Sequence, residues 1–269
     1  MSMSGVFKAK KKDGTVYYRS SVTFKNKHIS LGSYDTEIGA NKAYERAKEL
    51  LYSDIKYSEL SQAEILDEYN RDHIISFNKF ISIINFRDNN MYFKNPIYMC
   101  KRFFMYFYSP ECVFTFDAED LFYYATHKIL KRGSHLFVAD YGMQVNIMSR
   151  YGIRSHAVCG RDYHFLNGDR YDFRYENIQV INKYFGVQKI EKKTTKYKAV
   201  ILINGNYTIG VYDTEEEAAV AYNKAADIIT KVYPERTYRQ NYIEGLTKND
   251  YIRLYLKTQI SDKITNYNA

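Results

Sequence analysis

The sequence predicts an α+β protein in which two small three-stranded antiparallel sheet-plus-helix units flank a central helical region. The first observation is a repeat, because LGSYDTEIGANKAYERA at residues 31–47 returns as IGVYDTEEEAAVAYNKA at residues 209–225. The second is that a run with alternating side chains and many β-favouring residues precedes each copy. Within each copy, small and apolar residues at helical spacing follow the Asp-Thr pair. A repeated segment is one structural unit used twice, so both copies are expected to fold alike.

Each copy is predicted to contain a hairpin followed by a helix. The run Tyr197–Ile209 is split by Asn204-Gly205, the strongest short-range hairpin signal, and Tyr18–Leu31 turns near Asn26-Lys27. Asp35-Thr36 and Asp213-Thr214 then stand where a helix N-cap belongs, and glutamates follow them in a first turn that favours acids. Small residues at helical spacing, including Ala40, Ala43 and Ala47, give a face that can lie close on a sheet.

The repeat is expected to continue into a second helix. Ser61 to Glu64 and Thr247 to Asp250 both resemble the capping box that starts a helix. The predicted domains are residues 1–72 for the N-terminal unit with its following helix, 73–184 for a central region, and 185–269 for the C-terminal unit with its C-terminal helix.

The central region is predicted to contain a helix over Ala118–Lys131, ending at Gly133, and then a hairpin around Tyr141-Gly142. A dense aromatic tract, YFKNPIYMCKRFFMYFYSPECVFTF, precedes them at residues 92–116. Aromatic side chains at this density chiefly supply buried area, so we expect a core here. The alternative is that the tract stacks bases of a single strand beside Lys101-Arg102.

Composition restricts the partners and the compartment. The chain has 269 residues and a formal net charge of +8, so nucleic acid, an acidic protein surface and anionic lipid are all plausible partners. Cys100, Cys112 and Cys159 are odd in number and form no CxxC pair, which favours a reducing cytoplasm over a disulfide framework. No apolar run of about 18 residues occurs and the N-terminus has no apolar leader, so we expect neither secretion nor a membrane span.

The repeated units resemble the APETALA-two/ethylene-response-factor DNA-binding family, in GV…YRSSVTF…ISLGSYDT…A.KAYERA and in KYKAVILINGNYTIGVYDTEEEAAVAYNKAA. The resemblance implies that an open sheet face enters the major groove of DNA. Its groove-facing positions fall on Phe7, Ala9, Ser21, Thr23, His28 and Ser30 in the first copy and on Gln188, Ile190, Val200, Leu202, Asn206 and Thr208 in the second. None of these is Arg or Lys, so an arginine-guanine contact is not expected at them.

Charge separates the two copies. Residues 5–50 hold ten Lys and Arg against five acids, whereas residues 186–230 hold six lysines against six acids. Since phosphate contacts supply affinity, we expect the first copy to bind double-stranded DNA through Lys8, Lys10, Lys11, Lys12, Arg19, Thr23, Lys25, Lys27 and His28. The second copy is expected to present a neutral face with Ile190, Val200 and Leu202 to a protein partner or a second copy of the chain.

The segment YHFLNGDRYDFRYENIQVIN, residues 163–182, resembles the core of an HNH homing endonuclease, which implies a degenerate ββα-metal-like domain. By that resemblance the first metal ligand falls on His164, the general base on Phe165, the supporting asparagine on Asn177 and the second ligand on Gly186. Phe cannot accept a proton and Gly offers no side-chain ligand, so only the remnants His164 and Asn177 survive. We therefore expect no enzyme activity, no metal and no cofactor.

Other sites are not indicated. His156, Cys159 and His164 lack a fourth ligand and match no common zinc arrangement, so ordinary packing roles are expected for them. No phosphate-binding, serine-hydrolase or zinc-protease motif occurs. The sequence thus predicts a non-catalytic, cytoplasmic DNA-binding protein of phage or mobile-element origin, derived from an HNH homing endonuclease. The alternatives are a protein-binding inhibitor or adaptor, and a nuclease with rearranged ligands.

Overall fold

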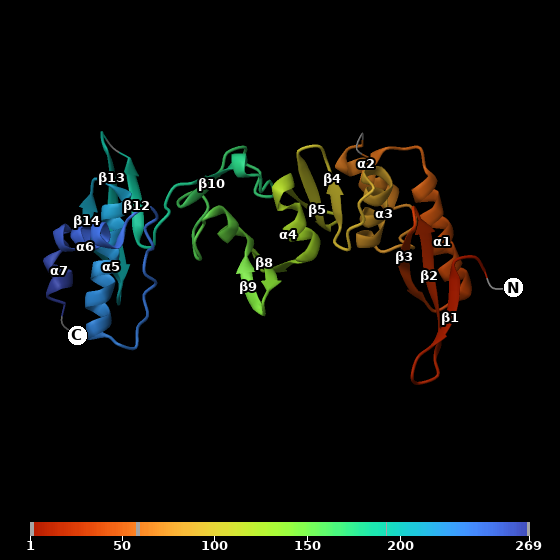
Figure 1. The fold of residues 1–269 in the computed structure, drawn as a ribbon, viewed down its shortest axis with the longest axis horizontal. Coiled ribbons are helices and arrows are strands. Elements are labelled where there is room, and N and C mark those ends of the chain that lie inside the picture. The colour runs from red at the N-terminus through yellow and green to blue at the C-terminus, as the bar shows by residue number, and fades with distance from the viewer. Residues whose placement is uncertain (1–2, 58–59, 192, 268–269) are drawn as a thin grey trace. The chain divides into compact units, whose positions relative to one another are not determined.

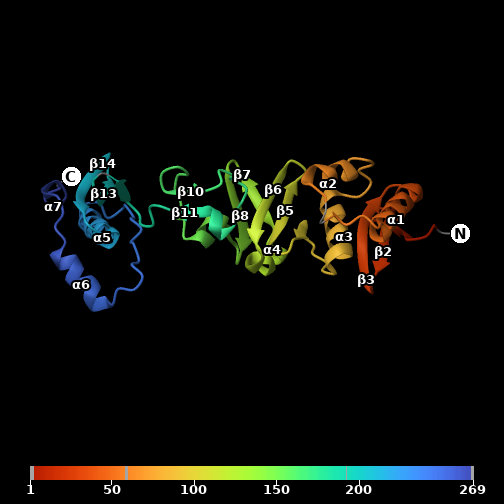
Figure 2. The same cartoon turned by 90° about the horizontal axis from the view of Figure 1, so that it is seen from above.

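The computed structural model describes residues 3–57, 60–191 and 193–267, and it confirms the α+β class with several small antiparallel sheets (Figures 1 and 2). The chain divides into two compact units. The first comprises residues 1–145 and 169–175, and the second comprises residues 146–168 and 176–269. The three-part division expected from the sequence stays a prediction.

The first unit begins with the predicted sheet and helix. Strands β1 (Val6–Lys10), β2 (Val16–Phe24) and β3 (Lys27–Tyr34) pair antiparallel in that order, and α1 (Glu37–Tyr52) lies across them. Ala40, Ala43 and Ala47 are fully buried, as their spacing predicted, because small side chains let the helix approach the sheet closely. The turn falls on Lys25 and Asn26, both at positive φ, one residue earlier than expected.

The second unit contains the matching structure. Strands β12 (Val187–Glu191), β13 (Thr195–Leu202) and β14 (Asn206–Tyr212) form the sheet, and α5 (Glu215–Val232) covers it. The β13–β14 turn encloses Asn204-Gly205, as predicted. Both sheets carry a bulge at the same place, after Ser20 in one copy and after Ala199 in the other.

The two copies also share side-chain contacts that the repeat explains. Thr36 and Thr214 cap their helices by accepting hydrogen bonds from Gly39 N and Glu217 N. Tyr34 and Tyr212 donate their hydroxyls to Ile74 O at 3.1 Å and to Gln259 O at 2.7 Å. Each tyrosine thereby fastens its sheet to the chain that follows the second helix.

The predicted second helices exist, as α2 (Gln62–Tyr69) and α6 (Lys248–Lys257), capped by Ser61 and Thr247. The end of each second helix is held by a cation from the preceding helix, at equivalent positions of α1 and α5. Arg46 Nη2 donates to Glu68 O at 3.0 Å, and Lys224 Nζ donates to Tyr255 O at 3.1 Å. Equivalent cations therefore bind backbone carbonyls of equivalent helices, so the repeat extends through the second helix.

Helix α3 (Phe77–Asn89) and one side of the following sheet form a continuous core with the N-terminal sheet. The helix is buried along most of its length, between α1 and the sheet of β4 (Ile97–Met99), β5 (Phe103–Ser109) and β6 (Cys112–Asp117). Phe104, Phe114 and Phe116 are at most 1% exposed, so the interpretation of the aromatic tract as a core is confirmed.

One expected helix is shorter than predicted. After η2 (Ala118–Asp120), α4 (Leu121–Thr126) ends well before Lys131, and β7 (Ile129–Arg132) begins. Ile129 pairs with Val138 of β8 (His135–Asp140), and both side chains are buried. Burial of this β-branched pair outweighs local helix propensity. Strand β9 (Met143–Asn146) completes the sheet and the predicted hairpin around Tyr141-Gly142.

Residues 169–175 return to the first unit beside β6. Phe173 N donates to Thr115 O at 2.7 Å, and Asp172 binds Arg174 through both carboxylate oxygens. The Asp-x-Arg pair of the HNH-like segment therefore braces this docked segment internally.

The second unit also contains η3 (Ile147–Tyr151), β10 (Tyr163–Phe165), β11 (Ile178–Val180) and α7 (Asp262–Thr265), and η4 (Tyr175–Asn177) begins at the last residue of the first unit. Asp162 is 1% exposed and holds the segment before β10, because it accepts hydrogen bonds from Arg154, Arg161 and Asn182. The Asn182 side chain in turn accepts from Lys189 N of β12 at 2.7 Å, which joins β10–β11 to the C-terminal sheet.

The expected ββα-metal-like succession is not present. Strands β10 and β11 pair antiparallel, but residues 181–186, all described, contain no helix and lead directly into β12. The physical reason is that Asn182 and Tyr184 pack into the start of the C-terminal unit, where they are 5% exposed.

Candidate nucleic-acid interface

The face of the N-terminal sheet opposite α1 is open. Cross-strand partners share a face, so the register defines its rows. The first row contains Phe7, Arg19 and Ser33; the others pair Ala9 with Tyr17, Ser21 with Ser30, and Thr23 with His28. The six groove-facing positions expected in this copy therefore do lie on one face.

That face also carries Arg19, one of the residues predicted to bind DNA, beside the six positions that lack Arg and Lys. Arg19 lies directly between Phe7 and Ser33 and is exposed. Its Nη2 and Nε donate to the Tyr17 hydroxyl at 2.6 and 3.2 Å, and its guanidinium lies 5.4 Å from the centre of the Tyr17 ring. The tyrosine thus holds the planar guanidinium above the sheet, where it can donate two parallel hydrogen bonds to a base edge or a phosphate.

The lysines predicted to bind phosphate gather at the β1–β2 end of this sheet. Lys8, Lys10, Lys11 and Lys12 are all exposed. The turn is closed by a hydrogen bond from Lys11 N to Thr15 O at 2.9 Å. Asp13 lies in the same turn, and the hydrogen bond from Thr15 N lowers the pKa of its carboxyl. Lys11 and Lys12 therefore lie in a short, closed loop at the end of the sheet, whereas Lys8 and Lys10 pair with Tyr18 and Val16, in rows on the α1 side and not on the open face.

The other two predicted lysines lie at the opposite end of the sheet and already have partners in the first unit. Lys25 Nζ donates to the Asn90 side chain and to Arg87 O, the latter at 3.4 Å. Lys27 Nζ lies 5.5 Å from the centre of the Tyr92 ring. These contacts tie the β2–β3 turn to the end of α3, which sequence spacing could not reveal.

The equivalent face of the C-terminal sheet differs from the prediction. Ile190, Val200 and Leu202 do lie on its open side, and Leu202 is 65% exposed. Lys198 occupies the row of Gln188 and Val211, in the place of Arg19, and Lys196 pairs with Ile190. The expected neutral face therefore carries two cations, and the Lys196 ammonium forms an ion pair with Asp213.

The HNH-like residues lie on the β10–β11 hairpin. His164 is exposed and pairs across the strands with Gln179, while Phe165 is half-buried. Asn177 is 3% exposed, and its side-chain oxygen accepts a hydrogen bond from Asn167 N at 2.8 Å. Its carbonyl accepts from Leu166 N, so Asn177 closes the loop after β10.

Gly186 belongs to the repeat. It has φ +69°, and a Cβ there would overlap the Tyr222 ring and the Val200 carbonyl oxygen. Gly5 has the same φ and the same relation to Tyr44. Val200 N also donates to Gly186 O at 2.7 Å, as Ser21 N does to Gly5 O. The position at which the HNH resemblance places a metal ligand is thus where the backbone of the C-terminal sheet packs against its own helix.

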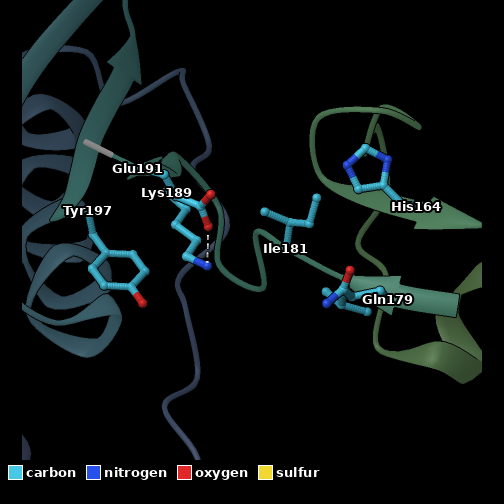
Figure 3. Close-up of a pocket in the computed structure, with 7 residues that line it drawn as sticks. His164, Gln179, Ile181, Lys189, Glu191 and Tyr197 are labelled. Atoms are coloured by element: carbon cyan, nitrogen blue, oxygen red, sulfur yellow. Dashed lines mark ion pairs between the residues drawn. The ribbon is translucent and has the colours of Figure 1, made fainter. Parts of the chain in front are cut away.

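A cavity of about 490 Å³ lies beside His164 in the second unit (Figure 3). Its lining is His164, Gln179, Val180, Ile181, Lys189, Glu191 and Tyr197. Lys189 Nζ and Glu191 pair at 2.6 Å, so the cation and the carboxylate in the lining neutralise each other. Among residues 3–57, 60–191 and 193–267, no three His, Cys, Asp or Glu side chains form a group that could hold a metal ion.

Comparisons with known proteins yield no relative: no family model, no curated protein and no solved structure matches this chain. Within the part of the chain that the structure describes, no helix is both long and apolar enough to cross a membrane.

Proposed function

We propose that this chain is a non-catalytic, cytoplasmic DNA-binding protein, of phage or mobile-element origin, that derives from an HNH homing endonuclease. The N-terminal sheet is the binding surface. The lysine loop contacts phosphates of double-stranded DNA, and the open face lies against the base edges.

The observation that carries the proposal is the place of Arg19. An exposed arginine, held by Tyr17 and flanked by Phe7, stands in the middle of the open face, and the exposed Lys11 and Lys12 lie in the loop at the end of that sheet. A fixed guanidinium is the group that most often binds guanine in the major groove, and lysines at the edge supply affinity that does not depend on sequence.

The roles of the HNH-like residues support a protein that does not cut. Phe165 offers no proton acceptor, Asn177 is engaged in closing a loop, and Gly186 is packed against Tyr222. Hydrolysis of DNA by HNH chemistry needs a general base and a metal. Phe165 at the base position and Gly186 at the second ligand position supply neither group. The three free cysteines fit a reducing compartment.

A salt titration of duplex binding tests the proposal. Binding should weaken steeply as salt rises, and changing Lys10, Lys11 and Lys12 to Ala should reduce the slope of log K against log salt by about 2 to 3. Changing Lys193 and Lys198 to Ala removes charge from the C-terminal unit and serves as the control. A wild-type chain that does not bind duplex DNA at low salt contradicts the proposal.

A plasmid incubated with magnesium or manganese tests the absence of catalysis. The plasmid should stay supercoiled. Metal-dependent cleavage by the wild-type chain, abolished by His164→Ala, would show instead a nuclease with rearranged ligands.

The second candidate is a protein-binding inhibitor or adaptor, and the C-terminal sheet favours it. Leu202 and Val211 are 65% and 55% exposed on its open face, where a partner or a second copy of this chain could cover them. Such an interaction would persist at high salt and would be lost in a Leu202→Asp, Val211→Asp variant. A partner that remains bound while duplex DNA is ignored would favour this function over the first.

A further inference from the structure

A tyrosine stands fully in solvent at the tip of the β8–β9 hairpin in the first unit. Tyr141 is 97% exposed, and Met143, two residues on, is 65% exposed. Figure 1 shows β8 and β9 side by side, and the turn that joins them contains only Tyr141 and Gly142. A hairpin of this length presents a large apolar side chain where nothing in its own sheet covers it.

The backbone at this tip does not favour a tyrosine. Tyr141 has φ +46° and Gly142 has φ +77°, so both turn residues are in the left-handed region. Two-residue turns of this kind prefer Asn-Gly or Asp-Gly, because a bulky side chain is strained at positive φ. A tyrosine here costs the fold stability and buries no area in return, which points to a role outside the fold.

The sheet that carries the tip is basic at its other end. Lys131 and Arg132 are exposed and pair with Leu136 and His135, at the end of β8 opposite Tyr141, and Lys128 is exposed just before β7. The acid of the hairpin, Asp140, is already engaged with the His127 imidazole at 3.5 Å. An apolar tip on a basic sheet fits a ligand with an anionic backbone and flat apolar surfaces inside it, and duplex DNA has both.

We propose that the β8–β9 tip, Tyr141 to Met143, is a wedge that enters the minor groove of duplex DNA and inserts between adjacent base pairs, kinking the duplex. This inference rests on the proposed function and adds a deformation of the DNA to it. Strand β8 is six residues long. At about 3.3 Å per residue its far end lies about 17 Å from the tip, so the cations there reach phosphates about five base pairs from the kink.

Energy transfer across a labelled duplex tests the wedge. A duplex of about 30 base pairs with several TA steps, which unstack easily, carries a donor at one end and an acceptor at the other. Wild-type protein should bring the ends closer. Tyr141→Asn should bind about tenfold more weakly, without the change in transfer, while its thermal midpoint stays equal or rises. Tyr141→Phe should behave as wild type, and Phe122→Ala, which removes an aromatic side chain that is 82% exposed on α4, should also leave the change intact.

The outcomes of this experiment distinguish the wedge proposal from the proposed DNA-binding function. A Tyr141→Asn variant that still shortens the end-to-end distance overturns the wedge, as does a wild-type chain that binds the duplex without shortening it. In both cases the proposed DNA-binding function stands. A wild-type chain that does not bind the duplex at low salt overturns both. If Tyr141→Asn no longer shortens the duplex but keeps its thermal midpoint, the wedge is supported. A residue with a merely structural role would lower the thermal midpoint as well.

Discussion

Gly186 allows a direct test of whether the C-terminal sheet is a repeat of the N-terminal one or a remnant of a metal site. In Gly186→Ala the new methyl group would lie well inside 3 Å of the Tyr222 ring and the Val200 carbonyl oxygen. Neither can move easily, because Tyr222 is 9% exposed on a helix and Val200 N is bonded to Gly186 O. Left-handed strain of about 1–2 kcal/mol and overpacking of about 1–3 kcal/mol together predict a loss of about 2–5 kcal/mol.

The matched control is Gly245→Ala in the same unit. Gly245 has φ +83°, but no heavy atom lies within 4 Å of the position that its Cβ would occupy, so only the strain of about 1–2 kcal/mol applies. Urea denaturation followed by circular dichroism measures both variants. If the two lose the same stability, the packing argument is refuted. A Gly186→His variant, which places a ligand at the expected metal position, should lose stability in the same way and gain no cleavage.

Three further predictions concern single side chains. Tyr17→Phe removes the hydroxyl that Arg19 binds, so duplex affinity should fall about two- to tenfold with an unchanged salt slope; an unchanged affinity in a gel-shift titration contradicts this role. Arg46→Leu removes the partner of Glu68 at 2.7 Å and leaves its carboxylate, 12% exposed, with the exposed Arg71 at 3.0 Å, so it should cost the first unit about 1.5–3 kcal/mol in a denaturant titration. Burial would raise the pKa of Asp162, but hydrogen bonds from Arg161, Val158 N and Asn182 hold it below its ordinary value of 3.8. Its contribution to stability is therefore complete above that pH and is lost as pH falls through the lowered pKa, and the unfolding midpoint of Asp162→Asn should vary less with pH below 4 than that of wild type.

The repeat made much of the fold predictable. Thr36 and Thr214 cap helices because hydroxyl oxygens satisfy free backbone amides, and this local rule needs no tertiary information. The position of Arg19 on the open face could also be predicted, since period-two alternation along β2 puts it on the same face as Ser21 and Thr23. The position of Ser33 could not be predicted, because the bulge beside Ser20 shifts the register of β3 and moves Ser33 onto the open face.

Other features depend on contacts distant in sequence. Lys25 looked free to bind phosphate, yet its partner Asn90 lies 65 residues away. The helix predicted to reach Lys131 is ended by burial of Ile129 against Val138, which no local pattern showed. The HNH resemblance pointed to Asn177, which closes the loop after β10, but it could not show that residues 181–186 lead into the strand β12 instead of a helix.

The divergence of the two copies is itself informative about partners. Positions that pack are the same in both: Gly5 and Gly186 lie on Tyr44 and Tyr222, and Tyr34 and Tyr212 bond the chain after the second helix. The open-face rows differ throughout, with Phe7, Arg19 and Ser33 in one copy and Gln188, Lys198 and Val211 in the other. Packing places no demand on these exposed side chains, and their differences give the two faces different chemistry. A guanidinium fixed by Tyr17 suits a planar anionic or base-edge partner, whereas on the C-terminal face Asp213 already neutralises Lys196. The N-terminal sheet is therefore the copy on which loss of DNA binding should be sought first.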